Sequence, residues 1–283
     1  MSFAAQVTSY ILTAMLSWVP LRNQIERTHD GKWVHDTHGY YVTEDADAAR
    51  ARYEKIASDI TAVAFDEKNP ALFKGTDGRL KTALALASIA SFEGGYHKWV
   101  ENGDCNSPEF QAQQKDRPHR ECDGGAAYSN WQIHMYNYVI KDGELTQAQY
   151  LENSLVSEDR EWMRAHKDDI IRGKDITADP KLAAQIAYYL VRYSTKNFKT
   201  LCSYTGEDCD GRQPKAHERL DRAINYLRAH PFVPEAEVPQ DVLDRQIFEI
   251  VAANPRGPSP LLLRTFASQT GPFAVSMPQI RLN

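Results

Sequence analysis

The feature that most constrains this chain is a run of residues, from 80 to 92, that is apolar nearly all round the surface of a helix. A helix without a polar face must be buried on every side. Thr76 and Asp77 supply side-chain oxygens that can cap its first turn. At its other end, Glu93-Gly94-Gly95 releases the backbone from the helix. The run therefore predicts a core helix that carries the Glu93 carboxylate out of the core.

Further helices should pack around this one. Between residues 44 and 66, apolar residues recur at three- and four-residue steps, which predicts one amphipathic helix. Asp179 as N-cap and Pro180 at the first helical position begin another helix. Pro214 begins a third, which stops before Pro231. The pattern predicts a mainly α-helical fold, of the α+β kind, with a small β element.

Three segments are expected along the chain. Residues 1–70 should hold an N-terminal helix, a hairpin in which 32–34 pairs with 40–42, and the amphipathic helix. Residues 71–230 should form the main helical domain, in which the polar stretch from Glu101 to Gly125 looks like a long loop.

The third segment, residues 231–283, is rich in proline and looks like a linker, a helix near 241–251 and an extended arm. Together with the N-terminal helix, this arm could contact assembly partners.

Composition and charge argue against two classes of partner, nucleic acids and membranes. A net charge of −5 with 25% charged residues lacks the basic excess of a nucleic-acid-binding protein, so no nucleic-acid partner is expected. The apolar stretch from Phe3 to Val19 is too short and too polar to span a bilayer, so no stable membrane insertion is expected. A signal peptide would need a basic residue before this stretch, yet the first one is Arg22.

Four cysteines form two local groups, Cys105 with Cys122 and Cys202 with Cys209. Four cysteines permit three disulfide connectivities, and the sequence does not choose among them. Local pairing would imply an oxidising destination, that is, an extracytoplasmic location. Four unpaired buried thiols are the alternative. His119 and Cys122 lack a second close ligand pair, so no metal site is expected.

Glu93 has the position that a general acid requires. Cleavage of a glycosidic bond needs a group that protonates the leaving oxygen, and apolar surroundings help a carboxyl group to keep its proton near neutral pH. On residue type alone, a solvated glutamate at a helix end is the simpler interpretation.

Two further sequence blocks favour the catalytic interpretation of Glu93. The first comes after Glu93 and reads Tyr128-Ser129-Asn130-Trp131-Gln132-Ile133. The second comes after the helix that begins at Asp179 and reads Ser203-Tyr204-Thr205-Gly206. With Ser91-Phe92-Glu93-Gly94-Gly95, this order resembles the lysozyme-like superfamily of goose-type lysozymes and lytic transglycosylases. The resemblance covers about residues 76–230.

The resemblance implies a lysozyme-like fold, Glu93 as catalytic acid, and a sugar cleft lined by Tyr128, Ser129, Trp131 and Gln132, with Tyr204 reaching the catalytic Glu. The sequence departs from the family pattern at Asn130 and Trp131, and its interval from Glu93 to Gln132 is longer than usual for the family. Trp131 could stack on a sugar or pack in the core.

A second carboxylate would decide the mechanism. Inverting hydrolysis needs a base about 6.5 to 9.5 Å from the acid, with water between them. Asp123 is the first candidate, because the goose-type enzymes place a water-orienting Asp before this block; Asp104 is the second. Either could instead be a loop residue that caps a turn. Without a base, the sugar's own hydroxyl would close to a 1,6-anhydro product. His97, His119 and His134 are more simply structural or solvated than general bases.

The sequence therefore predicts an enzyme that cleaves the MurNAc-GlcNAc bond of peptidoglycan, as a muramidase or a lytic transglycosylase, without metal or organic cofactor. It would act at the bacterial cell wall. The alternative is a non-catalytic structural or cell-wall-binding component of a virion or secretion apparatus that has the same fold.

Overall fold

The computed structural model describes residues 2–21, 24, 28–29, 32–33, 44–116, 120–134 and 136–234. Its helices are α1 (Phe3–Trp18), α2 (Ala46–Phe65), α3 (Gly78–Glu93), α4 (Lys98–Glu101), α5 (Pro108–Gln113), α6 (Cys122–Gly125), α7 (Ala148–Glu152), α8 (Ser157–Ala165), α9 (Gly173–Ala178), α10 (Pro180–Phe198), α11 (Cys202–Thr205) and α12 (Pro214–Ala229), with 3₁₀ turns η2 (Asp104–Asn106) and η3 (Lys167–Asp169). The strands are β1 (Thr28–His29), β2 (Lys32–Trp33), β3 (Ala127–Tyr128), β4 (Ile133–His134), β5 (Tyr138–Lys141) and β6 (Glu144–Gln147).

The fold is mainly helical with small antiparallel strand pairs, as the sequence predicted. In the described residues the strands pair as β1–β2, β3–β4 and β5–β6. Ser2–Pro234 forms one compact unit. The predicted helix near 241–251 and the C-terminal arm lie outside the described residues.

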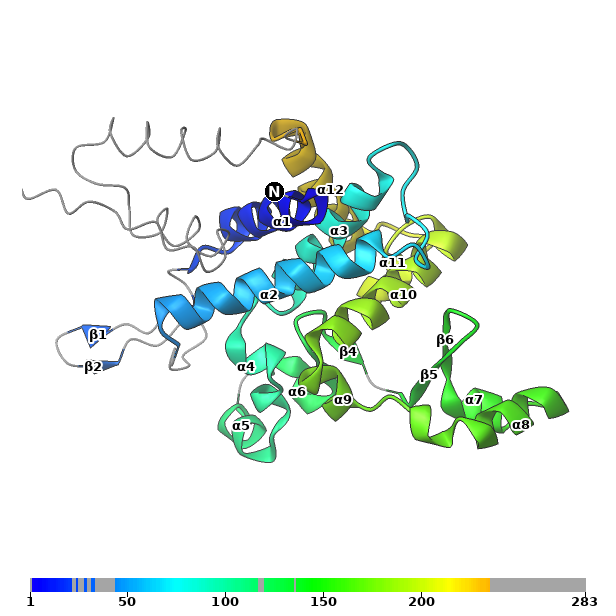
Figure 1. Cartoon of the computed structure of the whole chain (residues 1–283). Helices are drawn as coiled ribbons and strands as arrows, with labels where there is room; N and C mark the ends of the chain where they lie inside the picture. The colour runs from blue at the N-terminus through cyan, green and yellow to red at the C-terminus, as the bar shows by residue number, and fades with distance from the viewer. Residues whose placement is uncertain are drawn as a thin grey trace, which may run out of the picture. The chain divides into compact units, whose positions relative to one another are not determined.

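Helix α3 is the centre of the core. Leu84, Leu86 and Ile89 have no exposed surface, because α1, α2 and α12 all pack against this helix. Figure 1 shows α2 crossing the molecule in front of α3, with α1 and α12 close to α3. The apolar surface all round α3 thus explains why three other helices cover it, and the predicted core helix is confirmed.

Capping residues explain where the outer helices begin. The Asp45 side chain accepts from the Ala48 amide at 2.7 Å at the start of α2, and the Asp179 side chain accepts from the Lys181 and Leu182 amides at the start of α10. Pro214 occupies the first turn of α12. The sequence predictions for α2, α10 and α12 are therefore confirmed.

Helix α1 belongs to the core. Val7, Ile11, Ala14 and Met15 are fully buried and join the same apolar cluster as residues of α2 and α3. One face of the predicted N-terminal helix is thus occupied by the protein itself. Among the described residues, no helix has the length and apolar character needed to cross a bilayer.

Part of the predicted N-terminal hairpin is described. Lys32–Trp33 forms a strand, as expected, and it pairs with Thr28–His29. Residues 34–43, which include the expected second strand at 40–42, lie outside the described residues. The predicted pairing of 32–34 with 40–42 therefore stays a prediction.

The expected long loop from Glu101 to Gly125 is also wrong, because the segment contains η2, α5 and α6. The Ser107 hydroxyl accepts from the Phe110 amide and Pro108 occupies the first turn, so α5 has a regular helix start. Gln111 then donates to the carbonyl oxygens of Cys105, at 2.6 Å, and Glu121, at 2.9 Å. These bonds replace the solvent contacts that a long polar loop would make.

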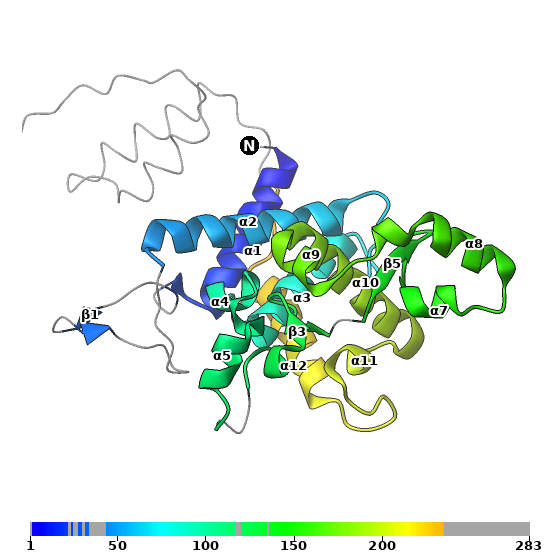
Figure 2. The same cartoon turned by 90° about the horizontal axis from the view of Figure 1, so that it is seen from below.

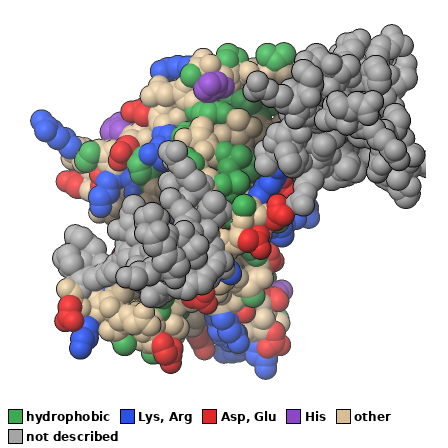
Figure 3. All heavy atoms as spheres, turned by 90° about the vertical axis from the view of Figure 1, so that its left-hand side faces the viewer, with side chains coloured by type: hydrophobic (Ala, Val, Ile, Leu, Met, Phe, Trp, Pro, Cys, Tyr) green, Lys and Arg blue, Asp and Glu red, His purple; other side chains and the backbone are tan. Residues whose placement is uncertain are grey.

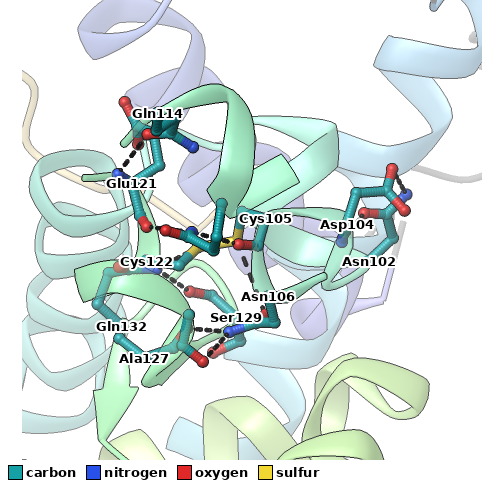
Figure 4. The surroundings of a disulfide bond; sticks show 12 residues. Asn102, Asp104, Cys105, Asn106, Gln114, Glu121, Cys122, Ala127, Ser129 and Gln132 are labelled. Carbon is teal, nitrogen blue, oxygen red and sulfur yellow. Dashed lines mark hydrogen bonds between the residues drawn. A yellow bond between two sulfur atoms is a disulfide. The ribbon is translucent and has the colours of Figure 1, made fainter. Parts of the chain in front are cut away.

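Two disulfides join local pairs, Cys105 to Cys122 and Cys202 to Cys209. Cys105 and Cys122 are buried against Trp99 and Val100 in a small apolar cluster of their own. Figure 4 shows this bridge between the segment that holds Asn106 and the segment that leads to Gln132.

Removal of the first bridge should destabilise the protein measurably. The double change Cys105→Ser and Cys122→Ser should lower the free energy of unfolding by roughly 3 kcal/mol, because it frees a loop of the unfolded chain. Urea denaturation measures this change, and peptide mapping without reductant tests the pairing itself. Four free thiols in the purified protein would contradict both the bridge and the expected loss.

A small lobe lies at one edge of the described structure. It consists of the β5–β6 hairpin with α7 and α8, and both views place it away from α4 and α5 (Figures 1 and 2). Val139, Ala148, Leu151 and Met163 form its own buried cluster. The lobe begins immediately after β4, so the hairpin that forms one wall of the cleft described below leads into it.

Acidic and basic side chains are mixed on one face of the described residues. On the face in Figure 3, Lys and Arg lie among Asp and Glu in the described part of the chain, and they do not gather into one basic stripe. This distribution agrees with the net charge of −5.

Candidate active site

Glu93 is the last residue of α3, and its carboxylate meets an arginine from α12. Arg219 Nε donates to Glu93 Oε1 at 2.7 Å, and Arg219 Nη2 lies 2.7 Å from the same oxygen. The side chains are 21% exposed for Glu93 and 9% for Arg219. Among the described residues, Oε2 has no hydrogen-bond partner. The carboxylate is therefore held from one side, and one oxygen is left free.

Arg219 is itself firmly placed. Its Nη1 donates to the Lys215 carbonyl at 2.9 Å, and its guanidinium lies 5.0 Å from the Phe92 ring centroid. Sequence reasoning missed this residue. Its signal was a charge at a buried position of the amphipathic helix α12, between Ala216 and Ala223.

The Glu93 carboxylate stands in the wall of a cleft of about 470 Å³. This volume lies within the range of roughly 300 to 1,000 Å³ that small-molecule sites occupy. Its walls come from α3, the β3–β4 hairpin, α10, α11 and α12, and the lining residues are Glu93, Asp123, Trp131, Gln132, Ile133, His134, Tyr136, Tyr138, Leu190, Tyr193, Ser203, Tyr204, Thr205, Gly206, Lys215 and Arg219. Five of the residues predicted from sequence therefore share one cleft, namely Glu93, Asp123, Trp131, Gln132 and Tyr204.

Trp131 lines the cleft but is almost wholly buried in the core. It is 2% exposed, and its indole nitrogen donates to the Leu86 carbonyl of α3 at 3.0 Å. A buried indole with a satisfied N–H has its ring faces covered by other side chains, so the structure favours core packing over sugar stacking for Trp131. The neighbouring Gln132 donates from Nε2 to the Ser129 carbonyl at 3.1 Å.

Tyr128 and Ser129 do not line the cleft. The Tyr128 ring packs so closely on Gly173 that a Cβ there would lie 2.3 Å from it. Ser129 is 2% exposed and has a φ of 63°, which a serine seldom adopts. The structure therefore does not bring these two residues into the cleft with the other predicted site residues.

Tyr204 lines the cleft but binds a different partner from the one the resemblance implied. Its hydroxyl donates to the Trp131 carbonyl, not to the Glu93 carboxylate. Burial raises the pKa of Tyr204 well above its usual value, and the nearby Glu93 carboxylate raises it further. The hydroxyl therefore keeps its proton at any physiological pH and holds the hairpin against α11 as a donor.

Asp123 has a partner within the cleft. Its Oδ2 lies 2.6 Å from His134 Nε2, and the side chains are 61% and 55% exposed. Residues 122–125 all have positive φ, including the non-glycine residues Cys122 at 51° and Asp123 at 46°. Consecutive left-handed residues are costly, and such strain is concentrated at functional sites. The disulfide at Cys122 and the register that pairs Ala127 with His134 hold this turn in place.

Asp104, the second candidate, does not line the cleft. Figure 4 shows it beside Asn102, whose amide nitrogen donates to Asp104 Oδ2 at 2.8 Å. His97 is likewise outside the cleft, where it stacks on Trp99 with ring centroids 4.2 Å apart. His119 lies outside the described residues. Of His97 and His134, the two that the structure describes, His134 lines the cleft.

Gly94, which follows Glu93, lies against the backbone of Asn130. A Cβ at this position would lie 2.5 Å from the Asn130 Cα and 2.7 Å from the Asn130 carbonyl oxygen. The chain leaving α3 therefore touches the backbone that leads to Gln132. This contact explains how residues 93 and 132 come to share a cleft.

Gly94→Ala should disturb both stability and activity. The added methyl group must push the Asn130 backbone away, which should cost about 1 to 3 kcal/mol of unfolding free energy, as overpacking does. Gly211→Ala is the matched control, because its Cβ would meet only the Asp208 side chain. Thermal unfolding of the two variants measures the difference. Equal melting temperatures would contradict the close contact.

The cleft thus combines a carboxylate at the end of a buried helix, a second carboxylate held by a histidine, and several tyrosines. Among the described residues, no group of His, Cys, Asp and Glu is placed to hold a metal ion. Comparison of the chain with protein-family models, with curated proteins and with solved structures finds no match.

Proposed function

We propose that this protein cleaves the glycan strands of bacterial peptidoglycan at the MurNAc-GlcNAc β-1,4 bond, with Glu93 as the general acid. The observation that carries the proposal is the presence of Glu93 and Asp123 in the wall of one cleft. Two carboxyl groups that flank a bound sugar are the groups that glycosidic cleavage needs. The fold would then be lysozyme-like, as the motif order implies.

The contacts of Glu93 suit the acid role in one respect. Arg219 contacts Oε1 alone among the described residues, so Oε2 is left to meet the glycosidic oxygen. The fixed arginine also prevents the carboxyl group from rotating, and a fixed group reacts faster than a mobile one because its orientation is already set. Exposed Tyr136 and Tyr193 in the lining offer flat apolar faces to the sugar rings.

The Asp123–His134 pair favours hydrolysis. In an inverting reaction, Glu93 gives a proton to the leaving oxygen, while Asp123 takes a proton from the water that attacks the anomeric carbon. His134 would act as a positioning residue, because its ring nitrogen holds Asp123 Oδ2 at 2.6 Å. The products are a reducing MurNAc end and a free 4-hydroxyl group. Without this base the strand would end in a 1,6-anhydro sugar.

One observation favours a second candidate function. An arginine that pairs with a carboxylate is also a common structural contact, and Glu93 and Arg219 join α3 to α12 across 126 residues of sequence. A protein of this fold that binds cell walls without cleaving them would need the pair for packing alone. Such a protein would be a structural or wall-binding component of a virion or secretion apparatus.

Turnover of purified cell walls separates the two functions. The proposed enzyme should clear a suspension of walls and release muropeptides with reducing ends, which mass spectrometry distinguishes from anhydro ends. Both disulfides suggest an oxidising compartment as the place of action, which for this substrate is the cell wall side of the membrane. Binding to walls without any clearance would favour the second candidate.

A further inference from the structure

We propose that a second pocket, formed by α1, α3 and α12, binds the peptide stems that peptidoglycan glycan strands carry. This inference rests on the proposed function, because it names a further part of the same substrate. The pocket has a volume of about 610 Å³ and is lined by Trp18, Phe92, Glu218, Asp221, Arg222, Asn225, Tyr226, Ala229 and His230.

Aromatic rings form the apolar part of this pocket. Trp18, from the end of α1, meets Tyr226 of α12 edge to face at 5.5 Å between ring centroids. His230 lies next to Tyr226, at 4.7 Å. Figure 1 shows α1, α3 and α12 close together. Rings fixed by one another offer contact area at little entropic cost to a ligand that binds there.

The pocket also contains an arginine whose charge no carboxylate cancels. Arg222 lies 3.5 Å from the Phe92 ring centroid, and its Nη1 donates to the Ser91 hydroxyl at 2.7 Å. No carboxylate of the described residues lies within ion-pair distance of it. Burial lowers the pKa of Arg222, which reflects the cost of keeping the cation there. A guanidinium with free donors in a pocket is suited to a ligand carboxylate.

Two acidic side chains line the same pocket. Glu218 and Asp221 are exposed on α12, and neither pairs with a basic group among the described residues. Glu218 is near enough to raise the pKa of Arg222, but it does not contact the guanidinium. The pocket therefore presents one positive and two negative groups that do not neutralise one another. The ligand that complements them carries both a carboxylate and an ammonium group.

Phe92 separates this pocket from the cleft. Its ring is contacted by Arg222 in the pocket and by Arg219 in the cleft, and the next residue of α3 is Glu93. A strand bound in the cleft would therefore have its side branches within reach of the pocket. Peptide stems branch from the glycan, have free carboxylates, and in many walls contain a diamino acid with a free ammonium group. They match the charges of the pocket, which Phe92 places next to Glu93 in the chain.

Calorimetric titration of the full chain with the tripeptide L-alanyl-γ-D-glutamyl-meso-diaminopimelate tests the site. We expect the parent to bind, Arg222→Gln to bind at least about tenfold more weakly, and Asp221→Asn to bind severalfold more weakly. Arg228→Gln is the matched control, because Arg228 is exposed on the same helix and does not line the pocket. No binding to the parent, or equal loss in Arg222→Gln and Arg228→Gln, would overturn the inference.

Two further measurements keep the result interpretable. Circular dichroism shows whether Arg222→Gln still folds; if it does not, the exposed Asp221→Asn carries the test alone. Cleavage of walls is then compared with cleavage of strands freed of their peptides, and Asp221→Asn should lose the preference of the parent for walls. If neither substrate is cleaved but the tripeptide binds, the proposed function fails and the site stands. If both are cleaved equally and nothing binds, only the site fails.

Discussion

Glu93→Gln should abolish the clearing of cell walls, with a loss of at least about 10² to 10⁴-fold in rate. The amide has the shape of the carboxyl group but no proton that it can give to the leaving oxygen. Its side-chain oxygen can still accept from Arg219, so the variant should fold. Turbidity of a wall suspension, followed with equal amounts of parent and variant, measures the rate.

Glu93→Gln also removes the charged partner of Arg219, so the stability of the variant must be measured together with its rate. Arg219 is 9% exposed, and a buried arginine that loses its charged partner destabilises a protein. Thermal unfolding should therefore be measured first, and the rates compared well below the lower melting temperature. Glu152→Gln, an exposed change at the end of α7, is the control for charge removal. Clearing by folded Glu93→Gln at the parental rate would remove Glu93 from the mechanism.

Asp123→Asn should reduce the release of reducing ends by on the order of 10²-fold, within the range for a positioned base. An amide cannot take a proton from water, whereas it can still accept a hydrogen bond from His134. Mass spectrometry of the released muropeptides gives the rate and the type of end together. His134→Gln should cause a smaller loss of the same products, because it frees Asp123 without removing the base.

Asp104→Asn is the matched control for Asp123→Asn. Both residues are acidic and flank the Cys105–Cys122 bridge, but Asp104 does not line the cleft. The control should keep the parental rate and the parental ends. An active Asp123→Asn variant that releases anhydro ends would exclude hydrolysis and make the protein a lytic transglycosylase. In that case Glu93 would act first as acid and then as base.

Several features were readable from the sequence because they depend on neighbouring residues. The burial of α3 follows from its apolar surface, and the starts of α2, α10 and α12 follow from Asp45, Asp179 and Pro214. The position of Glu93 at the end of α3 follows from the Gly94-Gly95 stop. Caps, helix stops and periodicity act within one or two turns, so a linear sequence carries them in full.

Partners from distant segments were decided only by the tertiary structure. Arg219 could have been suspected as a buried charge in α12, but nothing local shows that it binds Glu93. Trp131 had two equally reasonable interpretations until its indole was placed against Leu86. Tyr128 was expected in the cleft, but it packs on Gly173 and is not among the lining residues. Each of these contacts forms between elements far apart in the chain.

What the sequence by itself determined is the presence of the long helices α1, α2, α3, α10 and α12, and the residue types on which the proposed site is built. What only the tertiary structure decided is which of those residues meet. The resemblance ranked Asp123 before Asp104, but only the structure shows that a left-handed turn and the β3–β4 register place Asp123 beside His134, whereas Asp104 lies beside Asn102. The physical reason is that contacts between segments depend on the packing of the whole core, whereas helix formation depends mainly on the pattern within each segment.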